Sequence, residues 1–142
     1  MTLVCNCSYA ETVTIHKVIL LTKRAEPANH IMLAQTTTDK IGAYFDSFII
    51  DDAKYIQDVI EKSIPSDLKN KSQTDIEAYM QSTVLPKFNA QMGPLMKSKF
   101  GLGMAKLYHV DRIPAIVIND KYVYYGDNVS KAIKLISKRE TK

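Results

Sequence analysis

The stretch RIPAIVINDKYVYYG, residues 112–126, decides how this chain of 142 residues folds. Pro114 stands directly before the apolar run Ala115 to Ile118, although proline donates no hydrogen bond to a sheet. Proline is tolerated at the first residue of a strand, and an X-Pro bond adopts the cis form at modest cost. The stretch therefore predicts a strand that begins at an Ile-Pro step.

The same stretch predicts a hairpin. Strand-forming residues fill Ala115–Asn119 and Tyr122–Tyr125, and the polar pair Asp120-Lys121 separates them. A polar pair between two such runs is the spacing of a tight antiparallel turn. Alternation along the second run places Tyr122 and Tyr124 on one face of the sheet.

Two strands and two helices are predicted upstream of the hairpin. The β-branched segment 12–22 suits a strand buried on both faces, and Ala43–Ile50 predicts a second strand. Between them, Ala28–Gln35 is expected to form a short helix with Pro27 at its first turn. Asp51 and Asp52 suit the first turn of another helix, which ends at Pro65 and has as its apolar face Ala53, Ile56, Val59 and Ile60.

A helical insert is predicted between residues 74 and 109. Pro86 and Pro94 should divide it into two or three pieces, because each removes an intrahelical hydrogen bond, and Gly101 and Gly103 are expected to form another joint. Its methionines are expected to fill space between the pieces, although a Met-rich groove for a partner helix is an alternative. A closing helix with Asp127 or Asn128 as N-cap buries a stripe formed by Val129, Ala132, Ile133 and Ile136.

The order of these elements resembles that of thioredoxin-like proteins. Strands separated by helices imply parallel neighbours, and the final hairpin adds an antiparallel pair. We expect an α/β, thioredoxin-like fold in which a central mixed four-stranded sheet is flanked by helices, with the helical insert before the third core strand. In proteins of this fold an Ile-Pro step is usually cis and faces the active-site turn after the first strand, which corresponds here to residues 23–27.

Several segments also resemble a particular family. The closest resemblance is carried by residues 108–118, then 121–126 and 129–132, with looser similarity over 49–60, 64–67 and 18–22. These segments resemble the thioredoxin-like proteins encoded by bacterial integrating conjugative elements and, more loosely, the TrbC pilus-assembly proteins of conjugation systems. The resemblance implies export to the periplasm and a role beside other transfer or secretion proteins of the mobile element. It supplies no catalytic residues.

The two cysteines, Cys5 and Cys7, both lie near the start of the chain. Residues 1–10 resemble the end of a secretory signal, with Ser8 and Ala10 at the positions that signal peptidase reads. Cleavage after Ala10 would leave one thioredoxin-like domain, residues 11–142, without any cysteine. The alternative is a cytosolic N-terminus with two free thiols.

The predicted site residues favour binding over catalysis. The turn that carries Cys-x-x-Cys in a thioredoxin reads Lys23, Arg24, Ala25, Glu26 and Pro27 here, so thiol exchange at this turn is excluded. His16, His30 and His109 lack metal-site spacing, and phosphate loops and nucleophile motifs are absent. We therefore predict no enzyme activity, no cofactor and no metal. Arg112, Ile113 and Pro114 are the candidate peptide-binding corner, where an extended peptide could add to the sheet; alternatively, the proline only fixes the fold.

Composition and charge bound the remaining alternatives. Hydrophobic residues make up 46% and charged residues 24%, which is typical of a soluble globular domain, and no apolar run is long enough to cross a bilayer. The formal net charge of +4 resides beyond residue 130, in Lys131, Lys134, Lys138, Arg139 and Lys142 against Glu140. A nucleic-acid contact through this basic C-terminal helix is therefore an alternative to protein binding, although nucleic acid is not the expected partner.

Overall fold

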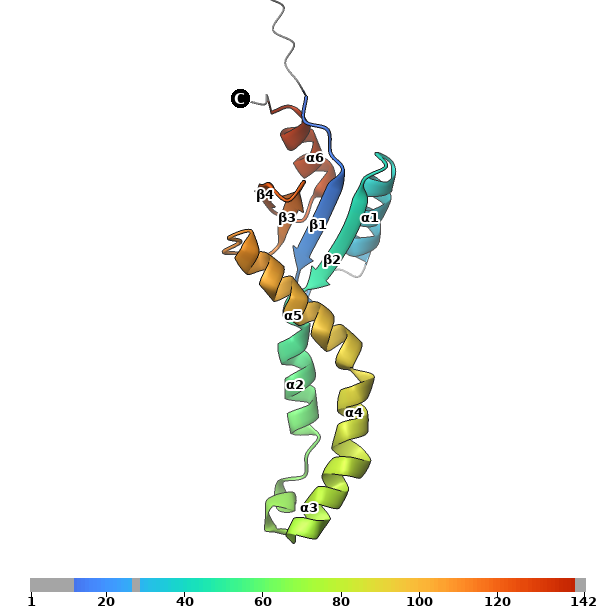
Figure 1. Ribbon diagram of the computed structural model, residues 1–142, viewed down its shortest axis with the longest axis vertical. Helices are drawn as coiled ribbons and strands as arrows, with labels where there is room; N and C mark the ends of the chain where they lie inside the picture. Colours follow the sequence, from blue (N-terminus) through green and yellow to red (C-terminus); the bar gives the residue numbers. More distant parts are fainter. Residues whose placement is uncertain (1–11, 27–28, 140–142) are drawn as a thin grey trace, which may run out of the picture.

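The computed structural model describes residues 12–26 and 29–139 and has a four-stranded mixed sheet at its centre. The strands are β1 (Lys17–Thr22), β2 (Tyr44–Ile49), β3 (Ala115–Ile118) and β4 (Tyr122–Tyr125). Their order across the sheet is β2-β1-β3-β4, with β1 parallel to β2 and antiparallel to β3 (Figure 1). Flanked by helices, this sheet confirms the predicted thioredoxin-like arrangement.

Helices cover both faces of the sheet. On one face, α1 (Asn29–Asp39) and α6 (Val129–Ser137) pack against Val18 and Leu20 of β1. On the other face, α5 (Met92–Leu107) covers Ile19 and Leu21. Because successive strand residues point to opposite faces, a strand buried on both sides must be apolar throughout. The four central residues of β1 and all four of β3 are buried accordingly.

The predicted helical insert, residues 74–109, and the predicted helix before it together form an elongated arm that points away from the sheet (Figure 1). The arm comprises α2 (Asp52–Lys62), a 3₁₀ turn (Ser66–Asn70), α3 (Gln73–Tyr79), a π-helical turn (Met80–Val84) and α4 (Leu85–Ala90). From the far end of the arm at α3, the chain returns through α4, and α5 then continues to the sheet. The arm is joined to the sheet at the start of α2 and along α5.

The prolines divide the helical insert as predicted. Pro86 lies in the first turn of α4, directly after the π-helical turn, and Pro94 lies in the first turn of α5. The first N–H groups of a helix have no intrahelical partner, so proline costs little there. The expected joint at Gly101 and Gly103 is wrong, because both lie inside the continuous helix α5.

Gly101 instead allows α5 to approach β2 closely. A Cβ atom at Gly101 would stand 2.5 Å from the Cβ of Phe48, whereas one at Gly103 would meet nothing within 4 Å. The first glycine therefore has a packing role that its sequence context does not reveal.

The hairpin between β3 and β4 turns one residue earlier than predicted. Asn119 and Asp120 have φ values of 53° and 57°, and the Lys121 N–H donates to the Ile118 carbonyl at 3.1 Å. Two central residues with positive φ define a type I′ turn, which asparagine and aspartate tolerate well. The Asn119 side chain also accepts hydrogen bonds from the backbone N–H groups of His16 and Lys17. Because Asn119 is itself the first central residue of the turn, β3 ends at Ile118.

The first strand and the first helix differ most from the predicted boundaries. The first strand spans only the second half of segment 12–22. Helix α1 runs to Asp39, past the predicted end at Gln35. Its extra turn contains three threonines whose hydroxyl groups donate to carbonyls four residues earlier. One of them, Thr38, is fully buried, so tertiary packing overrides the weak helix propensity of threonine.

Tyr108, at the end of α5, is tied to the hairpin turn. Its hydroxyl donates to Asp120, whose carboxylate also pairs with the Lys17 Nζ at 2.8 Å. The hydrogen bond to Asp120, assisted by burial, raises the pKa of Tyr108 to about 12. The hydrogen bonds from Lys17 and then Tyr108 lower the pKa of Asp120.

We expect the substitution Tyr108→Phe to lower the free energy of unfolding at neutral pH and to matter less in alkali. The pKa of folded Tyr108, about 12, lies above its ordinary value of 10.0. Its stabilisation is therefore fully present below pH 10 and is lost as the pH rises through about 12. Urea unfolding of both proteins at about pH 8 and about pH 11 measures the change. An equal difference between the proteins at both pH values would contradict this assignment.

Candidate functional site

The predicted site segments lie at the same end of the two central strands. Leu21 pairs with Ala115 in the antiparallel register of β1 and β3, which brings Thr22 opposite Pro114. The turn after β1 therefore begins beside the Ile113–Pro114 step, whose peptide bond is cis. Pro27, the last residue of the predicted turn, lies outside the described residues.

Arg24 ties this turn to the base of the arm. Its backbone N–H donates to the Asp51 carboxylate at 2.8 Å, and its Nη1 donates to the Asp52 carboxylate at 2.8 Å. Its guanidinium carbon lies 3.8 Å from the centre of the Tyr55 ring. The hydrogen bond to Asp52 is the main cause that raises the pKa of Arg24. We call these four residues, Arg24, Asp51, Asp52 and Tyr55, the Arg24 latch.

The latch corrects the prediction for the two aspartates. Asp51 stands at the N-cap position of α2, but its side chain makes no capping hydrogen bond to that helix. Both carboxylates accept hydrogen bonds from Arg24 instead. Asp52 has a side chain only 13% exposed, and a carboxylate that is this buried needs a partner. Arginine suits this role because its planar guanidinium both donates to carboxylates and stacks on aromatic rings.

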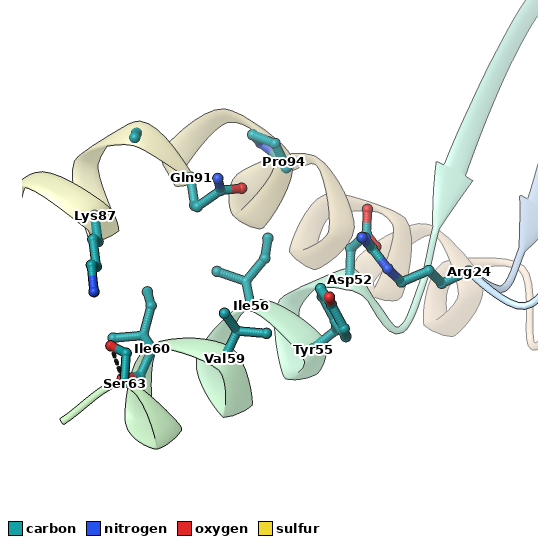
Figure 2. Close-up of a pocket in the computed structure, with 11 residues that line it drawn as sticks. Arg24, Asp52, Tyr55, Ile56, Val59, Ile60, Ser63, Lys87, Gln91 and Pro94 are labelled. Carbon is teal, nitrogen blue, oxygen red and sulfur yellow. Dashed lines mark hydrogen bonds and ion pairs between the residues drawn. The ribbon is translucent and has the colours of Figure 1, made fainter. Parts of the chain in front are cut away.

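An open groove of about 540 Å³ starts at the latch and runs along the arm between α2 and α4–α5 (Figure 2). Ile56, Val59 and Ile60 of α2 form one wall. Lys87 and Gln91 stand on the opposite wall. The apolar face predicted for α2 is thus only partly covered, since Ile56 is buried but Val59 is 47% exposed. This groove combines an apolar wall with charged groups at both ends, Arg24 and Asp52 at the latch and Lys87 at the other end.

The predicted corner at Arg112 and Pro114 lies at the surface of the protein. Arg112 is exposed, and its guanidinium carbon lies 4.3 Å from the centre of the Tyr125 ring. Ile113 is half-buried against the core cluster beneath α5. The Pro114 carbonyl accepts a hydrogen bond from the Gly126 N–H at 3.0 Å. The corner therefore presents one exposed arginine beside a partly buried step.

The histidines remain apart from this site. His16 and His109 are exposed, while the Nδ1 atom of His30 lies 3.7 Å from an Asp127 carboxylate oxygen. Within residues 12–26 and 29–139, no three His, Cys, Asp or Glu side chains gather as metal ligands. In the same ranges, no helix has the length and apolar character to cross a membrane.

A comparison with known families matches residues 29–142 to the family described as "Protein of unknown function (DUF1525)". The chain belongs to this family. The DUF1525 match runs from α1 to the end of the chain, so it takes in the Arg112 corner and the groove residues other than Arg24. No curated protein matches the sequence.

The Asp51 side chain offers a direct test of the latch. We expect the Arg24 amide hydrogen to exchange with solvent about tenfold faster in Asp51→Ala than in the wild type, because the substitution removes its acceptor. Asp51→Asn keeps an oxygen acceptor and should retain most of the protection. Hydrogen exchange followed by NMR measures both variants, and equal exchange in Asp51→Ala and the wild type would refute the latch.

Proposed function

We propose that this protein is a non-catalytic, thioredoxin-like accessory protein of an integrating conjugative element. It binds another protein of the conjugative type IV secretion apparatus, in the periplasm, and thereby assists assembly for DNA transfer. The Arg24 latch is the observation that carries the proposal. The turn used for chemistry in a thioredoxin is committed here to holding the arm in place.

The chemistry of the turn supports a binding role. A thioredoxin needs a thiolate at this turn and a second cysteine to resolve the mixed disulfide. Residues 8–142 contain no cysteine. Both carboxylates that face Arg24 are occupied by it, and its guanidinium also stacks on Tyr55. These side chains stabilise a surface, and the turn carries no thiol.

The groove beside the latch supplies a surface for a polypeptide. Its apolar wall can bury side chains of a partner, and Lys87 and Gln91 can hydrogen-bond to the partner's polar groups. The Arg112 corner lies at the same end of the sheet, where Arg112 contacts Tyr125 of the edge strand β4. A peptide that enters the groove and continues along this edge could add to the sheet by backbone hydrogen bonds.

Export belongs to the same proposal. Residues 1–11 lie outside the described residues, so the support comes from the signal-like sequence around Ser8 and Ala10. N-terminal sequencing of the protein recovered from the periplasm should begin at Glu11. An intact Met1 in a cytoplasmic fraction would contradict this part of the proposal.

The proposed function predicts that Val59→Asp blocks DNA transfer. We expect a donor strain that lacks the gene to transfer the element at least about a hundredfold less often than the wild type. The wild-type gene should restore transfer and Val59→Asp should not, because a charge in the apolar wall opposes burial by a partner. The control Leu135→Asp places the same charge at a similarly exposed position on α6 and should restore transfer. If a donor strain without the gene transfers the element as often as the wild type, the proposed function is refuted.

The basic C-terminal helix carries the alternative, a nucleic-acid contact. Lys131, Lys134 and Lys138 of this segment are exposed, whereas Ala132 and Ile136 belong to the core. Truncation at residue 131 would therefore disrupt the fold, so Lys131→Glu/Lys134→Glu is the appropriate variant. A salt-sensitive gel shift with DNA that this variant abolishes would favour the alternative.

A further inference from the structure

The solvent-facing side of α5 carries large apolar side chains. Met96, Phe100 and Leu107 are 58%, 62% and 66% exposed, and Gly103 is exposed between them. The opposite side of the helix packs on the sheet through buried Gly101 and Ala105. We call the exposed row Met96, Phe100, Gly103 and Leu107 the α5 seam. The expected burial of the methionines is wrong here, since Met80, Met92 and Met96 are exposed and Met104 packs against the core.

The residues of the α5 seam have the spacing of the a and d positions of a coiled-coil heptad. They follow one another at intervals of four, three and four, which keeps them in one narrow row along a helix. An isolated surface helix that packs on a sheet or a membrane has a wider apolar face. Gly103 leaves open space at its Cβ position, so a side chain from a facing helix could insert there. The spacing favours a second helix as the occupant.

The residues beside the seam are basic. Lys97 occupies the position on one flank, and Lys99 and Lys106 occupy the equivalent positions on the other. Lys97 pairs with Asp46 at 3.3 Å. Within the described ranges, neither Lys99 nor Lys106 has a carboxylate at ion-pair distance. No acidic residue occurs from Ala78 to Val110, so Lys99 and Lys106 have no acidic neighbour along α5.

We propose that the α5 seam docks an amphipathic helix of the partner protein, with apolar residues along its centre and Glu or Asp along its flanks. This inference rests on the proposed function and specifies the partner's chemistry. Flanking charges in a helix pair select partners of opposite charge. A second copy of this chain would bring lysines against lysines, which opposes self-association through the seam.

Two synthetic four-heptad peptides test the inference with the mature full-length protein. Both carry leucine at the central positions, and one has glutamate and the other lysine at the flanking positions. Like charges keep each peptide from pairing with itself. Fluorescence anisotropy of the labelled peptides measures binding, and anionic phosphatidylglycerol vesicles form a third arm. We expect the glutamate peptide to bind at least about tenfold more tightly than the lysine peptide, and less tightly at about 1 M salt.

Two variants of the seam should change this preference. Lys99→Glu/Lys106→Glu is expected to reverse it toward the lysine peptide, and Phe100→Ser should weaken binding of the glutamate peptide about tenfold or more. The control Leu135→Ser removes another exposed apolar side chain, on α6, and should leave binding unchanged. Circular dichroism checks that each variant is folded.

Several results would overturn the inference: no preference between the peptides, binding unaffected by the charge reversal, binding to vesicles only, or a dimer of the protein through the seam. If any of these results is combined with loss of transfer in Val59→Asp, the docking of a helix at the α5 seam is refuted and the proposed function is retained. Normal transfer without the gene, combined with charge-selective peptide binding, would refute the proposed function and leave the helix-binding property of the α5 seam.

Discussion

Gly101→Ala is expected to lower the free energy of unfolding by about 2 kcal/mol, although alanine is the better helix former. A Cβ atom at this position would stand 2.5 Å from the Cβ of Phe48 and 3.0 Å from the Cδ1 of Ile50. The first neighbour is fixed by the backbone of β2, so α5 must shift away from the sheet. Urea unfolding at neutral pH, with the midpoint and slope fitted together, measures the loss.

The same substitution two residues later is the matched control. Gly103 lies in the same helix and has open space around its Cβ position. Gly103→Ala should therefore raise the free energy of unfolding by up to about 1 kcal/mol through helix propensity alone. Equal effects of the two substitutions would mean that α5 does not approach β2 as described.

Ser98→Ala is expected to destabilise the protein by about 2 kcal/mol and to loosen the arm. Ser98 is 1% exposed. Its hydroxyl donates to the Ile50 carbonyl at 2.9 Å and accepts from the Ala53 N–H at 3.0 Å. One side chain on α5 thus joins the end of β2 to the start of α2. Alanine would leave both backbone groups without this partner in a partly buried place.

The effect of Ser98→Ala is measured by urea unfolding together with hydrogen exchange along α2. The control Ser130→Ala removes an exposed hydroxyl from α6 and should change the free energy of unfolding by less than about 0.5 kcal/mol. If both serines tolerate alanine equally, Ser98 does not anchor the arm.

Much of the sheet could be predicted because its determinants are local. The residues that follow Pro114 form short strand patterns, and the stripe of α6 repeats at helical spacing with Asn128 as its N-cap. Each pattern is complete within about ten residues. The order of these elements then limits the sheet to few topologies, and the predicted one is observed.

The candidate site could be predicted only in part, because its determinants are distant in sequence. Arg24 bonds to aspartates 27 and 28 residues away. Two aspartates before a helix have the composition of a capping site, so nothing local indicated their partner. Similarly, helical periodicity predicts that one face of α2 is apolar, and this face contains Ile56, Val59 and Ile60. Periodicity does not show whether another element covers that face, and here a groove remains.

Site-specific photocrosslinking in donor cells tests the central claim most directly, that the arm surface beside the Arg24 latch binds another protein of the transfer apparatus. A photoreactive amino acid at Val59 should give a crosslinked product that contains a protein encoded by the same mobile element. The same amino acid at Leu135, on the far face, should not. Crosslinks to no such protein from Val59, or identical products from both positions, would contradict the account.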